Sequence, residues 1–231
     1  MDKVLLISQI FDNAFPNGAY SHSFGFESFL RLNLINDEKS FLKWLEIYLE
    51  KSFLYNDALG FCLAYDGFDI INLDEILNAS SQSLEIKNAN KFMAQNSLKT
   101  LEIFNSNLLL DYQNLIKSKK CHGHNAIVFG LFCKEFGLSK EVLKNYIFSS
   151  IKNLAANATR AIPLGQRNTQ NILKNSYFLV NEIYENALNL SSFGSEYLGA
   201  GFCALEVGNL MHESLNFRLF KIGRASCRER V

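Results

Sequence analysis

The chain has 231 residues, of which 48% are hydrophobic and 20% charged, so it holds enough apolar material for a folded core and is not disordered in bulk. Lys plus Arg and Asp plus Glu number 23 each, and the formal net charge of zero argues against nucleic-acid partners. No apolar run approaches the roughly 20 residues of a membrane-spanning helix. Five cysteines without paired spacing, and no signal peptide at the N-terminus, predict a cytoplasmic protein with no membrane partner.

Helical periodicity begins after Asp37 in the first half of the chain. Asp37 is a predicted N-cap, and apolar residues follow it three and four positions apart between residues 41 and 53. Residues 66–92 have the weakest helical pattern. The Asn- and Ser-rich run 78–83 within them predicts a loop flanked by short helices. A second apolar stripe runs over residues 98–116 and predicts one helix of about five turns.

The second half of the chain is also patterned as helices. Residues 126–136 are apolar on nearly every side and predict a buried helix that stops at Gly137. Ser139 is the predicted cap of the next helix, which should end before Pro163 because the residue before a proline disfavours helical geometry. Further stripes predict helices over residues 172–188 and 198–219.

No segment alternates apolar and polar residues as a half-buried strand does. We therefore predict an all-α fold, a single compact multi-helix domain over residues 1–222 with little or no sheet. Residues 223–231 change abruptly to Arg and Cys in a chain otherwise rich in Asn, Lys and Phe, and we interpret them as a non-native tail.

Sequence motifs for a nucleotide-binding, metal-binding or catalytic site in this chain are weak. The string from Gly199 to Ala204 matches a dinucleotide-binding pattern, but both of its flanks read as helix rather than as a strand and a helix. Cys121, His122 and His124 invite a metal site, although three ligands within four residues cannot easily all reach one ion. A small metal-dependent or hydrolytic enzyme that uses these histidines with His22 and His212 stays open as an alternative, as does a helical scaffold for an unrelated partner.

Three segments place polar residues among apolar ones in a way that core packing does not require. Residues 15–27 predict a turn, rigid at Pro16 and permissive at Gly18, that leads into a helix near Tyr20. Residues 158–166 predict a helix that ends at Arg160, then a Pro-Leu-Gly corner and a new helix from Gln166. Residues 211–220 predict a helix with His212, Leu215 and Leu219 along one face.

These three segments together resemble the UreF family of urease accessory proteins. The first matches the family pattern F-P-x-G-x-[YF]-x-H-S-x-G-[LF]-E, the second its P-L-x-Q corner and the third its H-E-S-x-x-x-R-L-[FY] motif. The likeness runs in order and spacing over residues 5–221. It implies an all-α chaperone without enzymatic activity.

The resemblance also implies the partners of the chain and its site residues. We expect a homodimer that binds UreD/UreH, recruits the GTPase UreG to apo-urease and promotes GTP-dependent nickel delivery. Nickel and GTP would belong to the partners, so we expect no tightly bound cofactor, no metal site and no catalytic residue in this chain. The expected partner-binding residues, by their match to the family motifs and to the helix before the corner, are Tyr20, His22, Lys144, Phe148, Arg160, Gln166, His212 and Arg218.

Overall fold

The computed structural model describes residues 2–22, 24–81 and 83–213, and every regular element within these ranges is a helix or a helical turn. The all-α prediction is therefore confirmed. The chain begins with α1 (Lys3–Ile10), the 3-10 turn η1 (Ala19–Ser21) and the short helix α2 (Phe26–Arg31).

The helix predicted after Asp37 is present as α3 (Glu38–Tyr48). The Asp37 carboxylate accepts a hydrogen bond from the Ser40 backbone N–H at 2.8 Å, and the Ser40 hydroxyl lies 3.1 Å from the Asp37 backbone N–H, which completes a capping box. The helix does not end at Tyr48. It continues as the π-helix η2 (Leu49–Ala58) and then as α4 (Leu59–Asp66), so three segments form one rod.

The loop predicted around residues 78–83 lies between α5 (Ile70–Ser80) and α6 (Leu84–Leu101), but α6 has 18 residues and is not the predicted short helix. The single helix predicted over residues 98–116 is wrong. After α6 the chain forms the 3-10 turn η3 (Glu102–Phe104), turns left-handed at Asn105 (φ 53°) and starts again as α7 (Asn107–Lys117). The break is stabilised because the side chains of Ser106 and Glu135 accept hydrogen bonds from the first backbone N–H groups of α7.

The buried helix predicted next is α8 (Asn125–Glu135), which Gly137 follows in a left-handed conformation (φ 58°). Ser139 caps the 3-10 turn η4 (Lys140–Val142), from which α9 (Leu143–Ala161) continues and ends before Pro163. These three predictions are confirmed. The sequence signals were local, a glycine, a serine and a proline, and each fixes the backbone within a few residues of itself.

Two predictions for the last third of the chain are corrected. The stripe over residues 172–188 is divided at Ser176 into α10 (Gln166–Asn175) and α11 (Tyr177–Ser191). The helix expected from residue 198 begins only as α12 (Cys203–Glu213). Gly199 has φ 82°, and its N–H donates to the Tyr55 carbonyl of η2 at 3.0 Å instead of joining a helix. The part of this expected helix beyond Glu213 lies outside the described residues.

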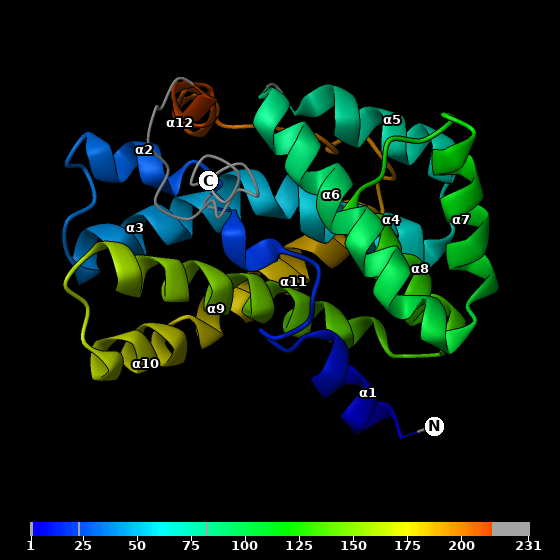
Figure 1. Cartoon of the computed structure of the whole chain (residues 1–231), viewed down its shortest axis with the longest axis horizontal. Helices are drawn as coiled ribbons and strands as arrows, with labels where there is room; N and C mark the ends of the chain where they lie inside the picture. Colours follow the sequence, from blue (N-terminus) through cyan, green and yellow to red (C-terminus); the bar gives the residue numbers. More distant parts are fainter. Residues whose placement is uncertain (1, 23, 82, 214–231) are drawn as a thin grey trace, which may run out of the picture.

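The centre of the fold is the packing of α4 on α8 (Figure 1). A Cβ added to Gly60 would lie 3.6 Å from Ala126, and one added to Gly130 would lie 2.8 Å from Ala64, so the two helices run parallel. The absence of a side chain at Gly130 lets the helices approach to backbone contact. Around this pair, α11 covers α4, α6 and α7 cover α8, and α9 packs on α10 and α11.

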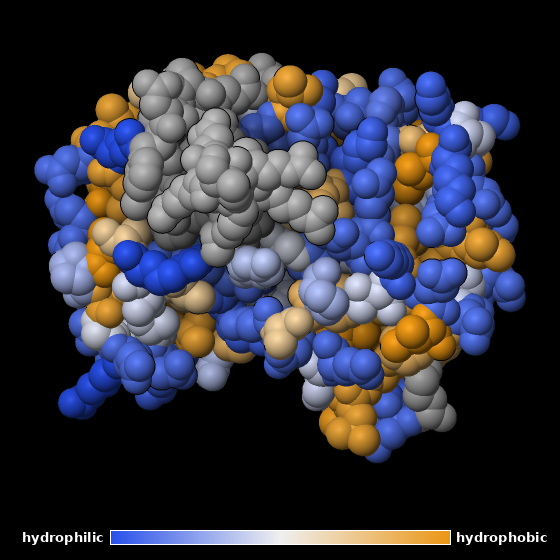
Figure 2. All heavy atoms as spheres, in the orientation of Figure 1, coloured by the Kyte–Doolittle hydropathy of each residue, from blue (hydrophilic) through white to orange (hydrophobic). Residues whose placement is uncertain are grey.

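The visible surface is mixed in hydropathy, with an apolar area over α1 that includes Val4 (72% exposed) and Leu5 (67% exposed) (Figure 2). None of the helices in the described part of the chain is both long and apolar enough to cross a bilayer.

Candidate functional site

The N-terminal motif folds as a tight turn against α9. Gly18 has φ 86°, a conformation that a side chain disfavours, and the Asn17 side chain accepts a hydrogen bond from the Ala19 N–H at 3.0 Å. The predicted turn is confirmed, but the helix expected near Tyr20 is only the 3-10 turn η1. The α-helix starts six residues later, after Gly25, which also has a positive φ of 84°.

Three of the expected site residues lie together where η1 meets the C-terminal end of α9. Tyr20 is 54% exposed, and the Arg160 guanidinium donates to its backbone carbonyl at 3.4 Å. The backbone carbonyl of His22 accepts from the Asn157 side chain at 3.1 Å, and Asn157 in turn accepts from Arg160. Tyr20, His22 and Arg160 are called the η1 patch below. It presents a phenol and a guanidinium at the surface, the groups that dominate protein interfaces.

Gln166 lies beyond the same end of α9. It is the first residue of α10, directly after the predicted Pro-Leu-Gly corner, and it is exposed. The hydroxyls of Thr159 and Thr169 lie 2.9 Å apart and tie α10 to α9. The corner predicted from Pro163 and the helix start at Gln166 are both confirmed.

Lys144 and Phe148 form a second area near the other end of α9. Sixteen residues separate Lys144 from Arg160, which is about 24 Å along a helix axis. The Lys144 ammonium lies 3.1 Å from a Glu141 carboxylate oxygen and 4.6 Å above the centre of the Tyr184 ring. The Phe148 ring packs edge-on against Tyr177 at 5.6 Å. The fold therefore separates these two residues from the η1 patch.

The C-terminal motif starts at His212 in α12, and Arg218 lies outside the described residues, as does the side chain of His212. The helix α12 packs on α2, the helix that directly follows the N-terminal motif. The Ser28 hydroxyl donates to the Gly208 carbonyl at 2.7 Å, and a Cβ at Gly208 would lie 2.4 Å from the Phe29 ring. The start of the third motif thus lies close to the end of the first.

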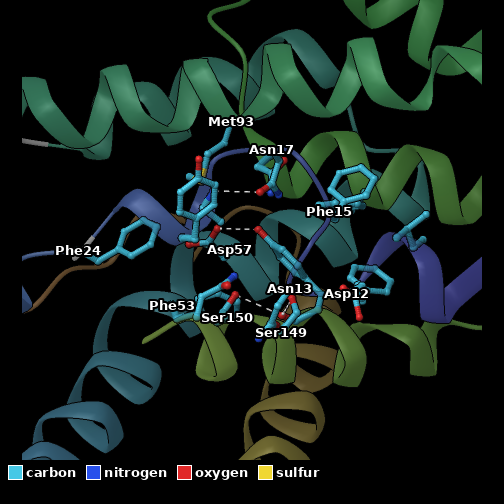
Figure 3. A pocket seen from close by; sticks show the side chains of 18 of the residues that line it. Asp12, Asn13, Phe15, Asn17, Phe24, Phe53, Asp57, Met93, Ser149 and Ser150 are labelled. Carbon is cyan, nitrogen blue, oxygen red and sulfur yellow. Dashed lines mark hydrogen bonds between the residues drawn. The ribbon is translucent and has the colours of Figure 1, made fainter. Parts of the chain in front are cut away.

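The N-terminal motif also lines an interior cavity of about 40 Å³ (Figure 3). Asn17 of the motif, Asp57 of η2 and Ser150 of α9 line it from three different segments. A buried water needs roughly 10–15 Å³, and organic ligands occupy about 300 Å³ or more, so the cavity has room for a few waters only.

Burial shifts the pKa values of ionisable groups at and near this cavity. Burial raises the pKa of the Asp57 carboxyl, and neighbouring His124 and a 3.0 Å hydrogen bond from the Tyr146 hydroxyl partly oppose the rise. Burial also lowers the pKa of His124 and raises the pKa of Tyr146 well above its ordinary value. These shifts belong to the interior of the fold, and the two cavities that Asp57 lines in the described part of the chain hold about 40 Å³ each.

The Cys121–His124 segment is a loop, as predicted, and its backbone is held by a buried carboxylate. Asp74 accepts hydrogen bonds from the N–H groups of His122 and Gly123, at 2.5 and 2.9 Å. The side chain of His124 accepts from the Ala126 N–H and caps α8. Burial raises the pKa of the Cys121 thiol to about 12, which keeps it protonated. Among residues 2–22, 24–81 and 83–213, no three His, Cys, Asp or Glu side chains gather as a metal site.

The fold places two further residues beside the N-terminal motif that the sequence motifs do not include, Asn157 and Asp57. Asn157 is fully buried, and it contacts His22 across 135 positions of the chain. The available signal was a polar residue on the apolar face of each helix, at Asn157 between Leu154 and Ala158 and at Asp57 before Ala58.

Comparisons with known proteins agree with the motifs. A sequence model of the UreF family matches residues 35–177. The chain is 34% identical over 228 residues to the urease accessory protein UreF of Bacillus sp. (strain TB-90), covering 95% of this chain and 99% of that protein. It is 35% identical over 224 residues to the protein of the same name from Streptococcus salivarius (strain 57.I), covering 94% and 93%. The protein of that name from Paenarthrobacter aurescens (strain TC1) is 32% identical over 220 residues.

Proposed function

The chain belongs to the UreF family of urease accessory proteins, and on this premise we propose that it is a nickel-insertion chaperone for urease. With UreD/UreH it recruits the GTPase UreG to apo-urease in the cytoplasm and so promotes GTP-dependent nickel delivery. It acts as a homodimer and catalyses no reaction itself. Nickel is the cargo of this assembly, and both nickel and GTP are bound by the partners.

One observation carries the proposal: the similarity to urease accessory proteins spans about 95% of the chain. The contacts of the first two motif segments support it. Two motifs far apart in sequence meet at the η1 patch, and the third begins on α12, which packs on the helix after the first. A surface assembled from separate segments is what a protein needs when it acts by presenting a shape to partners. The partner-binding residues proposed are Tyr20, His22, Lys144, Phe148, Arg160, Gln166, His212 and Arg218.

The direct test replaces the resident UreF in cells that express a complete urease operon with added nickel. The chain, ended after Ile222, should restore urease activity, and the full 231 residues should restore less if the non-native tail interferes with UreD/UreH. No activity from soluble, folded protein that also fails to co-elute with its own UreD/UreH would refute the proposal.

A second test separates the chaperone from an enzyme or a nickel carrier. Titration calorimetry of the purified chain with Ni²⁺, and a GTP hydrolysis assay, should both give no signal. Stoichiometric submicromolar nickel binding, or GTP hydrolysis without UreG, would contradict the assignment of cargo and nucleotide to the partners.

A further inference from the structure

The side chain of Asn157 joins the two segments that form the η1 patch. Its Nδ2 donates to the backbone carbonyl of His22 at 3.1 Å, and its Oδ1 accepts from the Arg160 guanidinium one helical turn away. The same guanidinium donates to the Tyr20 carbonyl at 3.4 Å. One amide thus connects a motif near the N-terminus to the cation at the end of α9.

The residues of this contact differ in their exposure to solvent. Asn157 has no exposed surface, whereas Arg160 and Tyr20 are exposed, so a partner protein would touch these two and not the amide. A buried amide is costly unless its donor and acceptor are both satisfied, and here both are satisfied by groups of the η1 patch. Asn157 shares this buried face of α9 with Leu154 and Ala158, where packing alone does not require a polar residue.

Holding the patch has a consequence for binding. An unrestrained Arg side chain loses rotamer freedom when it docks, and a hydrogen bond that it donates to a fixed acceptor removes part of that loss in advance. The bond to His22 likewise fixes where η1 stands relative to α9. Without the amide, Arg160 and the Tyr20–His22 turn would each keep their chemistry but lose their relative position.

We propose that Asn157 is a positioning residue, which holds Tyr20, His22 and Arg160 as one preformed surface for UreG. This inference rests on the proposed function of the η1 patch. It assigns to Asn157 no contact with any partner, and its effect on binding passes through Arg160 and the His22 carbonyl.

The test measures the affinity of the full chain, in complex with UreD/UreH, for UreG in the presence of Mg²⁺ and GTP. Asn157→Leu is close in size and removes both hydrogen bonds. Affinity should fall about tenfold, the effect of losing one hydrogen bond to a charged group. Tyr65→Phe is the matched control, because it removes a 2.8 Å side-chain bond to the distant Leu138 carbonyl and should leave affinity unchanged.

A double-mutant cycle with Arg160→Ala distinguishes positioning from general loosening. On the Arg160→Ala background, Asn157→Leu should weaken binding by clearly less than tenfold, because only the part of its effect that passes through the His22 carbonyl remains. A tenfold loss on that background, or an equal loss for Tyr65→Phe, would overturn the proposal. So would wild-type affinity for Asn157→Leu.

Asn157→Asp keeps the test valid if the leucine variant does not fold. Aspartate has the same size and still accepts from Arg160, but it cannot donate to His22. Its affinity should fall while circular dichroism stays unchanged, and unchanged affinity would overturn the role of the His22 bond. Failure of the wild-type complex to bind UreG would instead count against the proposed function, so the two failures are distinguishable.

Discussion

The contact of α8 with α4 should not tolerate a methyl group at Gly130. A Cβ there would lie 2.6 Å from the Phe61 carbonyl oxygen and 2.8 Å from the Ala64 Cβ, and neither backbone-bound atom can move away alone. Overpacking costs about 1–3 kcal/mol, and two contacts shorter than 3.0 Å place this site in the upper part of that range, about 2–3 kcal/mol. Replacing glycine by alanine within a helix gains about 1 kcal/mol in return. Gly130→Ala should therefore lose about 1–2 kcal/mol net, which lowers the Tm of a chain of this length by about 2–8 °C.

Gly60→Ala is the matched control, since it lies on the same interface. Its Cβ would first meet the end of the flexible Leu77 side chain, at 3.1 Å, and not a backbone atom. We expect its Tm within about 2 °C of wild type, because the helix-propensity gain offsets a small shift of Leu77. Differential scanning calorimetry of the three proteins gives the answer. A Gly130→Ala protein as stable as Gly60→Ala would show that the two helices do not approach to backbone contact.

Three further predictions concern single side chains. Burial raises the pKa of Asp57, so its carboxylate costs stability as pH rises. Asp57→Asn should therefore raise the free energy of unfolding at pH 8, and this gain should vanish below the unfolded pKa of 3.8. A variant less stable than wild type in pH 8 melting curves would contradict this sign. Glu135→Ala removes the acceptor for the first N–H groups of α7 and should cost about 1–2 kcal/mol in urea unfolding, whereas an unchanged midpoint would mean that solvent replaces it. Arg218→Ala should impair urease activation with unchanged circular dichroism, and a normal urease yield would remove Arg218 from the proposed site.

Helix ends with a local signal were predictable from the sequence. Asp37 and Ser139 act as caps, and Gly137 ends a helix, because each satisfies or releases backbone groups within one turn. The break near Asn105 was not predictable in this way. The apolar stripe passes through it without interruption, and the carboxylate that stabilises the new helix start comes from Glu135, about thirty positions later.

The π-helix η2 escaped prediction for a related reason. Its sequence keeps enough of the ordinary apolar spacing to be read as a continuation of α3, and its Tyr55 carbonyl is bound by the N–H of Gly199 from the far end of the chain. One tertiary hydrogen bond thus joins two segments whose backbone geometry the sequence pattern does not predict, η2 and the residues before α12.

The residues of the candidate site likewise differ in whether a local sequence signal predicts them. Tyr20, His22 and Gln166 lie in motifs whose glycines and prolines fix a local backbone shape, so the neighbouring sequence predicts their positions. The role of Asn157 depends on the His22 carbonyl, which lies 135 positions away in the sequence. Asp57 depends in the same way on the Tyr146 hydroxyl, 89 positions away. A motif can therefore preserve the exposed groups of a binding surface while the residue that holds them in place sits elsewhere in the chain. For this reason a buried polar residue whose hydrogen-bonding groups are satisfied by two separate segments is a better guide to how those segments are arranged than their consensus residues.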